Sequence, residues 1–222
     1  MAFSIAIDGP AGAGKSTIAK ALAKRLGFIY VDTGAMYRTM ALELLRKGIS
    51  PEDVPAMEQA CQDVEISIAY EEGSQQVYLN GENVSSLIRR EEVGNMASVS
   101  AANGKIREKL VDLQRQMAAR ENVVMDGRDI GTCVLPQADV KIYLTASVHT
   151  RATRRYKEYL EKGQKVDLQQ IEKDIEKRDY QDMHRDISPL KQAEDAVLLD
   201  SSDMGIEEVI DAMIALYEKK KQ

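Results

Sequence analysis

The residues with the clearest chemical meaning lie between Gly9 and Thr17, where the chain reads GPAGAGKST. Gly9, Gly14, Lys15 and Ser16 fill every defined position of the pattern GxxxxGK[ST]. Glycine lets successive backbone N–H groups turn toward phosphate oxygens, and the N-terminus of a following helix adds roughly half a positive charge. An apolar run precedes this stretch and a helical pattern follows it, which is the context that the motif requires. The stretch therefore predicts a loop that binds the phosphates of a nucleotide.

Each part of this loop has an expected role. The ammonium group of Lys15 reaches the β and γ oxygens of a bound ATP, and the hydroxyl of Ser16 is offered to Mg²⁺. Mg²⁺ is the expected cofactor, with Ser16 as its expected protein ligand. We predict that ATP is bound by Gly9, Pro10, Ala11, Gly12, Ala13, Gly14, Lys15, Ser16 and Thr17.

Several arginines stand outside this loop, near predicted strand ends and in a segment rich in both charges. The planar guanidinium fork suits phosphate and is charged at any working pH. Because one loop already serves the donor, separate arginines indicate a second anionic group. These arginines are Arg38, Arg107, Arg128, Arg178 and Arg185.

Residue patterns that the chain lacks reduce the number of possible acceptor classes. The NKxD and DxxG motifs of guanine-nucleotide switch proteins are absent from the sequence, and the only histidines are His149 and His184. A hydroxyl acceptor usually needs a positioned base, whereas a phosphate monoester, with a second pKa of about 6, is already ionised at neutral pH. Transfer then requires only alignment and charge neutralisation. The residues favour a kinase that moves a phosphoryl group from a nucleotide directly to another phosphate.

The elements that must position these residues follow an alternating pattern. Five short apolar runs, at residues 3–7, 28–31, 122–125, 141–144 and 196–199, are typical of buried parallel strands, and helical patterns separate them. This alternation predicts an α/β fold with a parallel sheet covered on both faces. Asp8, Asp32, Asp126 and Asp200 follow four of the runs, at the edge where such sheets bind ligands. We expect Asp200 to be a cap or turn residue rather than part of the site.

The segment from about residue 50 to 104 departs from that pattern. The stretches VEISIAY and QQVYLNG, on either side of EEGS, predict a β-hairpin inserted between a helix and the third strand. Two interpretations are open for this hairpin: a surface decoration, or a module that touches the ligand.

Length, net charge and cysteine content indicate the domain size, the classes of partner and the cellular location to expect. The 222 residues suffice for one sizeable domain, and the formal net charge of −6 argues against general binding of nucleic acid. Cys61 and Cys133 form no CxxC pair, which favours a reducing, cytoplasmic location. No signal peptide and no run of roughly 20 apolar residues is evident, so we expect no membrane association. A monomer is the expected state.

Four blocks together resemble a known family: IDGPAGAGKST, DTGAMYR, DGRDIGT and RDYQDMHRDISPL are similar to those of the bacterial cytidylate (CMP) kinases, which are nucleoside monophosphate kinases. The resemblance spans nearly the whole chain. It implies a P-loop NTPase fold with a five-stranded parallel sheet of order 2-3-1-4-5, flanked by helices. It also implies a core of residues 1–49, 105–146 and 191–222, an arm for the nucleoside monophosphate at about 50–104, and a lid at about 147–190.

The resemblance also implies roles for individual residues. Thr33 and Arg38 match acceptor-site positions, with Arg38 on the CMP phosphate, and Ser98 and Arg107 match positions that contact cytosine. Family members often have serine where Thr33 stands, and several nucleoside monophosphate kinases have glycine where Ser16 stands. The remaining matches are Arg128 to a phosphate ligand, Asp129 to a cytosine ligand, and Arg178, Asp182 and Arg185 to lid-side positions on the ribose and phosphates. The implied catalytic residues are Lys15, Arg128, Arg178 and Arg185.

Some readings stay open. The carboxylate of Asp129 suits the N4 donor of cytosine and disfavours uracil, but Asp129 could instead pair with Arg128. Asp126 is either a buried turn carboxylate or a group near Mg²⁺. Arg151 and Arg155 either contact the donor or lie on a helix surface.

The expected function is transfer of phosphate from ATP to CMP, and to dCMP, by direct in-line displacement. The alternatives are a kinase for another nucleotide or small metabolite, a regulatory module that only binds ATP, and an RNA-associated ATPase.

Overall fold

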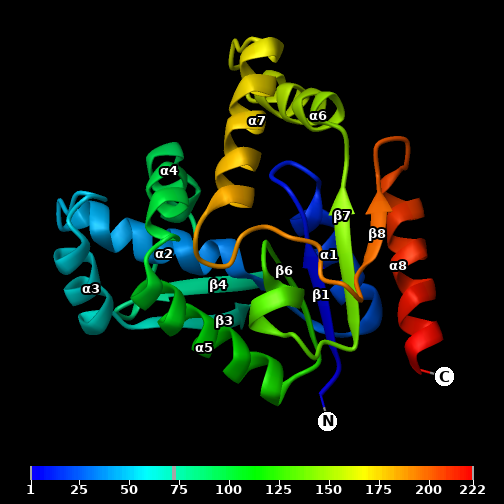
Figure 1. The fold of residues 1–222 in the computed structure, drawn as a ribbon, viewed down its shortest axis with the longest axis horizontal. Helices are drawn as coiled ribbons and strands as arrows, with labels where there is room; N and C mark the ends of the chain where they lie inside the picture. The colour runs from blue at the N-terminus through cyan, green and yellow to red at the C-terminus, as the bar shows by residue number, and fades with distance from the viewer. Residues whose placement is uncertain (1, 72–73, 222) are drawn as a thin grey trace. The chain divides into compact units, whose positions relative to one another are not determined.

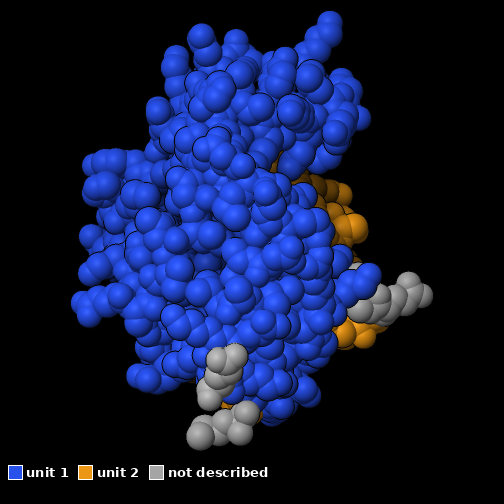
Figure 2. All heavy atoms as spheres, turned by 90° about the vertical axis from the view of Figure 1, so that its right-hand side faces the viewer, with its two compact units in different colours: residues 1–30, 120–222 blue, residues 31–119 orange. Residues whose placement is uncertain are grey.

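The computed structural model describes residues 2–71 and 74–221 of the chain. These residues form two compact units, one made of residues 1–30 and 120–222 and the other of residues 31–119 (Figure 2). The first unit is therefore assembled from two stretches that are distant in the sequence. We describe each unit by itself.

A five-stranded parallel sheet carries the predicted phosphate loop (Figure 1). Its strands are β1 (Ser4–Asp8), β2 (Ile29–Asp32), β6 (Val123–Gly127), β7 (Val140–Thr145) and β8 (Val197–Asp200), in the order β2-β6-β1-β7-β8. Counted among the parallel strands this is 2-3-1-4-5, so the predicted fold class is confirmed. All five predicted runs became strands, displaced by one or two residues at their ends. Continuous apolar runs suit the inner strands β1, β6 and β7, which are largely buried. The prediction of burial was wrong for the outer strand β8, where Val197 and Leu198 are exposed. Three of the four aspartates are the last residue of their strand, and Asp126 is the last but one.

Helices of the first unit cover this sheet or stand at its carboxyl edge. They are α1 (Lys15–Leu26), α6 (Val148–Glu161), α7 (Leu168–His184) and α8 (Ile206–Lys221), with a π-helical turn, η2 (Ile130–Val134). Leu22 of α1 and Met213 of α8 join Ile5, Ile142 and Leu144 of the strands in one buried cluster. Helices α6 and α7 share a smaller cluster of their own around Ala152, Ile171 and Ile175. This pair of helices occupies the segment predicted as a lid.

The second unit contains the predicted insertion. Its elements are α2 (Thr33–Arg46), α3 (Val54–Asp63), β3 (Ile66–Glu71), β4 (Ser74–Leu79), β5 (Glu82–Asn83), the 3₁₀ turn η1 (Leu87–Arg89), α4 (Glu91–Ser100) and α5 (Gly104–Arg120). Strands β3 and β4 pair antiparallel from Ile66 opposite Leu79, which confirms the predicted hairpin, and β5 adds a third strand. Glu72 and Gly73 of the predicted EEGS turn lie outside the described residues. The unit is wider than the predicted arm at 50–104, since it also includes α2 and α5.

Glycines shape the loop between β1 and α1. Gly9, Gly12 and Gly14 have φ angles of 148°, 76° and 84°, which residues with a side chain rarely adopt. Gly14 is the N-cap of α1. Gly9 is also the tightest position: a Cβ atom placed there would lie 1.9 Å from the carbonyl oxygen of Leu144 in β7. The loop therefore passes against the neighbouring strand at a point where only hydrogen fits.

We predict that Gly9→Ala destabilises the first unit far more than Gly163→Ala. Gly163, after α6, also has a positive φ of 72°, but nothing lies within 4 Å of an added Cβ. The control substitution should cost about 1 kcal/mol, and Gly9→Ala about 3 kcal/mol or more, because overlap with a backbone oxygen adds to the strain. In thermal unfolding, Gly163→Ala should lower the melting point by roughly 2–4 °C and Gly9→Ala by at least roughly 6 °C. Equal shifts in the two variants would contradict the close approach to Leu144.

Candidate active site

Lys15 is the centre of the phosphate loop in the first unit. Its side chain is only 5% exposed, and Nζ donates a hydrogen bond of 2.7 Å to the carbonyl oxygen of Pro10. Burial, together with the positive charge of Arg128, holds the pKa of Lys15 well below its usual range, while the carboxylates of Asp126, Asp8 and Asp182 oppose that shift. A bound polyphosphate would add several negative charges beside this amine. Binding of such an anion and full protonation of Lys15 are therefore coupled.

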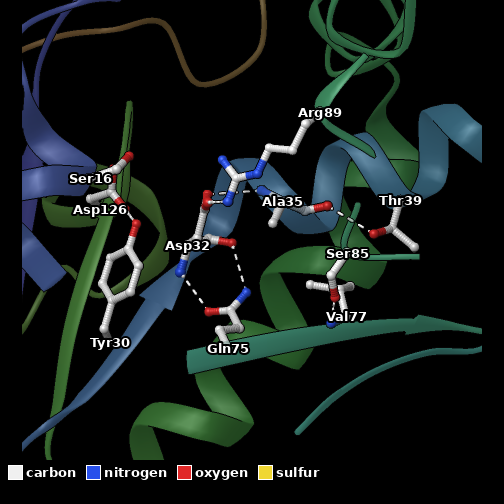
Figure 3. A network of polar contacts seen from close by, with 10 residues as sticks. All are labelled: Ser16, Tyr30, Asp32, Ala35, Thr39, Gln75, Val77, Ser85, Arg89 and Asp126. Carbon is white, nitrogen blue, oxygen red and sulfur yellow. Dashed lines mark hydrogen bonds and ion pairs between the residues drawn. The ribbon is translucent and has the colours of Figure 1, made fainter. Parts of the chain in front are cut away.

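Ser16 and Asp126 bring a hydroxyl and a carboxylate together at the start of α1. Ser16 Oγ donates to Asp126 Oδ2 at 3.0 Å, and the hydroxyl of Tyr30 donates to Asp126 Oδ1 at 2.9 Å (Figure 3). Asp126 is buried near the end of β6, as one of its two interpretations from the sequence expected, and the other, a group near Mg²⁺, stays a prediction. Its carboxylate lies against Ser16, the residue predicted to bind the metal. The sequence pattern gave no sign of the contact with Tyr30.

Asp8 organises the segment that follows β6. Its two carboxylate oxygens accept the backbone N–H groups of Ile130 and Gly131, both at 2.7 Å. Burial raises the pKa of Asp8 to about 6, against the lowering effect of those two bonds. Asp8 thereby fixes the backbone directly after Arg128 and Asp129. Its position after a strand was the only signal in the sequence, and that signal did not assign this role.

Four of the predicted site residues meet between the loop after β6 and the end of α7. Arg128 Nε donates to Asp182 Oδ2 at 2.8 Å, and Arg185 Nη2 lies 3.6 Å from Asp129 Oδ1. The structure thus joins Arg128 to Asp182 and Asp129 to Arg185. Arg178 lies one turn before Asp182 on α7, on the same helix face and half-buried.

Arg151 contradicts one of its two interpretations from the sequence, a place on the helix surface, while a contact with the donor stays a prediction. It is 4% exposed, which rules out a surface position, and its guanidinium bonds the carbonyl oxygens of Ala146 and Ala11 at 2.8 and 2.9 Å. Nη2 also pairs with Asp179 of α7 at 2.7 Å. Arg151 therefore ties α6 and α7 to the phosphate loop. Arg155 is half-buried and contacts the hydroxyl of Tyr159 one turn away.

The second unit gathers the other predicted residues around α2. Thr33 begins this helix and is buried, and Arg38 lies further along it. Arg107 of α5 is also buried, donates to the carbonyl oxygen of Ala101 at 3.4 Å, and has its guanidinium carbon 5.6 Å from the ring centre of Tyr37 on α2. Ser98 is half-buried on α4, which packs against α2.

Asp32 caps α2, a role that the sequence did not single out. Its Oδ1 accepts the N–H of Ala35 at 2.9 Å, and its Oδ2 lies 3.3 Å from Arg89 Nη2 (Figure 3). Asp200, expected to be a cap or turn residue, accepts from the backbone N–H and hydroxyl of Ser202 in the turn before α8.

Among residues 2–71 and 74–221, no helix combines the length and the apolar character needed to span a membrane.

Solved structures share the fold at low sequence identity. A gluconokinase from Sinorhizobium meliloti aligns with a TM-score of 0.51 at 12% identity, covering 99% of this chain and 94% of its own. A shikimate kinase from Bacteroides thetaiotaomicron has a TM-score of 0.51 at 14% identity, covering 97% of this chain and 98% of its own. At this identity the likeness supports the fold alone.

Sequence comparison identifies the family. The family model described as "Cytidylate kinase" matches residues 5–219. The chain is 50% identical to a cytidylate kinase of Lactobacillus johnsonii over 220 residues, which are 99% of this chain and 96% of the relative. It is 48% identical to a cytidylate kinase of Caldicellulosiruptor bescii over 217 residues, covering 98% and 96%. With a family match over nearly its whole length, the chain belongs to the cytidylate kinase family.

Proposed function

We propose that this protein transfers the terminal phosphate of ATP to CMP, and to dCMP, forming CDP or dCDP and ADP. The observation that carries this proposal is the family match over residues 5–219. The glycine-rich loop with its buried lysine is consistent with ATP as the donor.

The first unit supplies the donor site. We propose that the backbone N–H groups of the loop cradle the phosphates of ATP and that Lys15 contacts the β and γ oxygens. Arg151 donates to the carbonyl oxygen of Ala11 and so helps to fix the backbone of the loop. The residues proposed to bind ATP are those named from the sequence, Gly9 through Thr17.

The chemistry of Ser16 and Asp126 fits Mg²⁺. Mg²⁺ prefers oxygen ligands and is usually held by one or two carboxylates together with substrate phosphates and water. A hydroxyl and a carboxylate oxygen 3.0 Å apart at the start of α1 form such a set. When bound, the ion would neutralise charge on the donor phosphates. We propose Ser16 as the direct ligand of the ion. Asp126, which accepts from the hydroxyl of Tyr30, would orient the hydroxyl of Ser16.

The acceptor residues are proposed from both units. In the second unit these are Thr33, Arg38, Ser98 and Arg107; in the first they are Arg128, Asp129, Arg178, Asp182 and Arg185. Arginine forks suit the phosphates, and the carboxylate of Asp129 suits the N4 amine of cytosine. The ion pairs that Arg128 and Arg185 make in the first unit show that both guanidinium groups already lie beside carboxylates and are held in position.

The proposed chemistry needs no covalent intermediate. An ionised oxygen of the CMP phosphate forms a bond to the γ phosphorus of ATP while the bond from that phosphorus to the bridging oxygen breaks, and ADP leaves. Lys15, Arg128, Arg178 and Arg185 stabilise the charge that spreads over the transferring group. We further propose that residues 147–190 act as a lid that excludes water from this step, and that the protein works as a cytoplasmic monomer.

The proposed function predicts selectivity for the acceptor base. In a coupled assay that follows ADP formation with Mg²⁺ and ATP, CMP and dCMP should be phosphorylated, and kcat/KM for CMP should exceed that for UMP by at least roughly fivefold. ATP without acceptor serves as the control and should give only slow ADP release. Equal rates with CMP, UMP and AMP would exclude the proposed specificity.

Asp129→Asn should remove most of the preference for CMP over UMP, a reduction of roughly fivefold or more, because an amide can face either the N4 amine of cytosine or the O4 oxygen of uracil. The ratio of kcat/KM values for the two acceptors measures this change. Asp203→Asn, at an exposed turn before α8, is the matched control and should leave the ratio unaltered. An unchanged ratio in Asp129→Asn would remove Asp129 from base recognition.

Asp126→Asn should raise the Mg²⁺ concentration needed for half-maximal activity by roughly tenfold or more, because a neutral amide orients the hydroxyl of Ser16 less well and brings no negative charge near the ion. The measurement is a Mg²⁺ titration at fixed ATP and CMP. Asp200→Asn, also at the end of a strand but bonded within its own turn, is the control. If both variants need the same Mg²⁺ as the unmodified protein, Asp126 has no role at the metal.

A further inference from the structure

The inserted hairpin contacts the backbone of Asp32, the residue at the end of β2. The side chain of Gln75, on β4, accepts the N–H of Asp32 through Oε1 at 2.8 Å and donates through Nε2 to the carbonyl oxygen of Asp32 at 3.4 Å (Figure 3). β2 is an edge strand of the five-stranded sheet. The amide of Gln75 thus offers Asp32 the donor and the acceptor that another strand would have provided.

The side chain of the same aspartate is fixed by two further groups of the second unit. Oδ1 caps α2 by accepting from Ala35, and Oδ2 faces the guanidinium of Arg89, which lies in η1 beyond the hairpin. Asp32 is 6% exposed, whereas the side chain of Arg89 is 63% exposed. The Gln75 contacts should therefore be stronger than the ion pair, because solvent screens exposed charges.

The guanidinium of Arg38 lies near the side chain of Asp32, on the same side of Gly34. A Cβ atom placed on Gly34 would lie 3.2 Å from Asp32 Oδ1 and 3.6 Å from Arg38 Nη1. The guanidinium of Arg38 and the capping carboxylate therefore flank the same small space in the first turns of α2. A shift of Asp32 would displace both the start of the helix at Thr33 and the group beside which Arg38 rests.

We propose that Gln75 is a positioning residue for acceptor binding, and that Arg89 assists it: through Asp32 they fix the start of α2, where Thr33 and Arg38 stand. This inference rests on the proposed function, since it assigns those two residues to the acceptor. The sequence left two interpretations of the inserted hairpin open, a surface decoration and a module that touches the ligand. The proposed role is intermediate between them. The hairpin acts on the acceptor site through Asp32 and needs no contact with the ligand.

The test compares Gln75→Leu with Gln76→Leu. Leucine keeps much of the bulk of glutamine but can neither donate to nor accept from Asp32. Gln76 is the next residue of β4, and its side chain accepts from Asn83 Nδ2 at 3.2 Å. Each variant therefore loses side-chain hydrogen bonding in the same strand, but only Gln75→Leu releases Asp32.

The measurements are KM for CMP, KM for ATP, the dissociation constant for CMP alone by calorimetry, and the melting point. Gln75→Leu should weaken CMP binding and raise KM for CMP by roughly 3- to 10-fold, the effect of about one net hydrogen bond, with KM for ATP within about twofold. Gln76→Leu should leave both KM values unaltered. Arg89→Gln should raise KM for CMP by less than about threefold.

Three results decide the matter. A selective loss of CMP affinity in Gln75→Leu supports the inference. If Gln75→Leu lowers only the melting point, or shifts both KM values equally, or matches Gln76→Leu, the contact is merely structural and the inference is wrong while the proposed function stands. If the unmodified protein neither binds nor phosphorylates CMP, the proposed function is wrong and the inference falls with it.

Discussion

The buried amine of Lys15 is the constraint on which the site of the first unit depends. Lys15 is enclosed at the carboxyl edge of the sheet, where an unpaired charge costs several kcal/mol. The carboxylates around it could neutralise it, yet each has its own partner. Asp8 accepts two backbone N–H groups, Asp126 accepts two hydroxyls, and Asp182 accepts from Arg128. Lys15 itself donates to a backbone carbonyl. Because burial and Arg128 lower the pKa of Lys15, a ligand that brings negative charge would favour the protonated form of this amine.

That arrangement explains which parts of the molecule could be predicted from the sequence. The inner strands were predictable because burial on both faces requires continuous apolar runs, and the phosphate loop because its glycines need positive φ angles at fixed spacing. The strand order followed from family resemblance rather than from the runs themselves. These features are local, or are carried by a motif that reports a local backbone conformation.

The contacts that could not be predicted join residues far apart in the chain. Asp8 bonds backbone groups more than 120 residues away, Arg151 bonds a carbonyl oxygen 140 residues away, and Gln75 reaches Asp32 across 43 residues. Each involves a backbone partner, whose identity leaves no trace in the sequence. A polar residue in such a position looks like any surface residue. The sequence also left the partner of Asp129 open, and the structure places the side chain of Arg185, 56 residues further along the chain, beside it.

The architecture of this protein does not by itself define an acceptor. Proteins named as gluconokinase and shikimate kinase share it at 12% and 14% identity, and one fold can carry many functions. An acceptor is recognised by the side chains that a particular chain places on such a fold. The second unit, residues 31–119, holds such side chains on a hairpin and four helices, among them the buried Arg107 of α5.

The amide of Gln75 has one more consequence, for behaviour in a crowded solution. The outer strand of an open sheet displays vacant backbone groups that can recruit a strand from another molecule and begin aggregation. At the last residue of β2 those groups are already taken by a side chain of the same chain, so an intruding strand would first have to displace it. Both outer strands, β2 and β8, are only four residues long and so offer short templates. On β2 the contact with Gln75 shortens that template further, at Asp32.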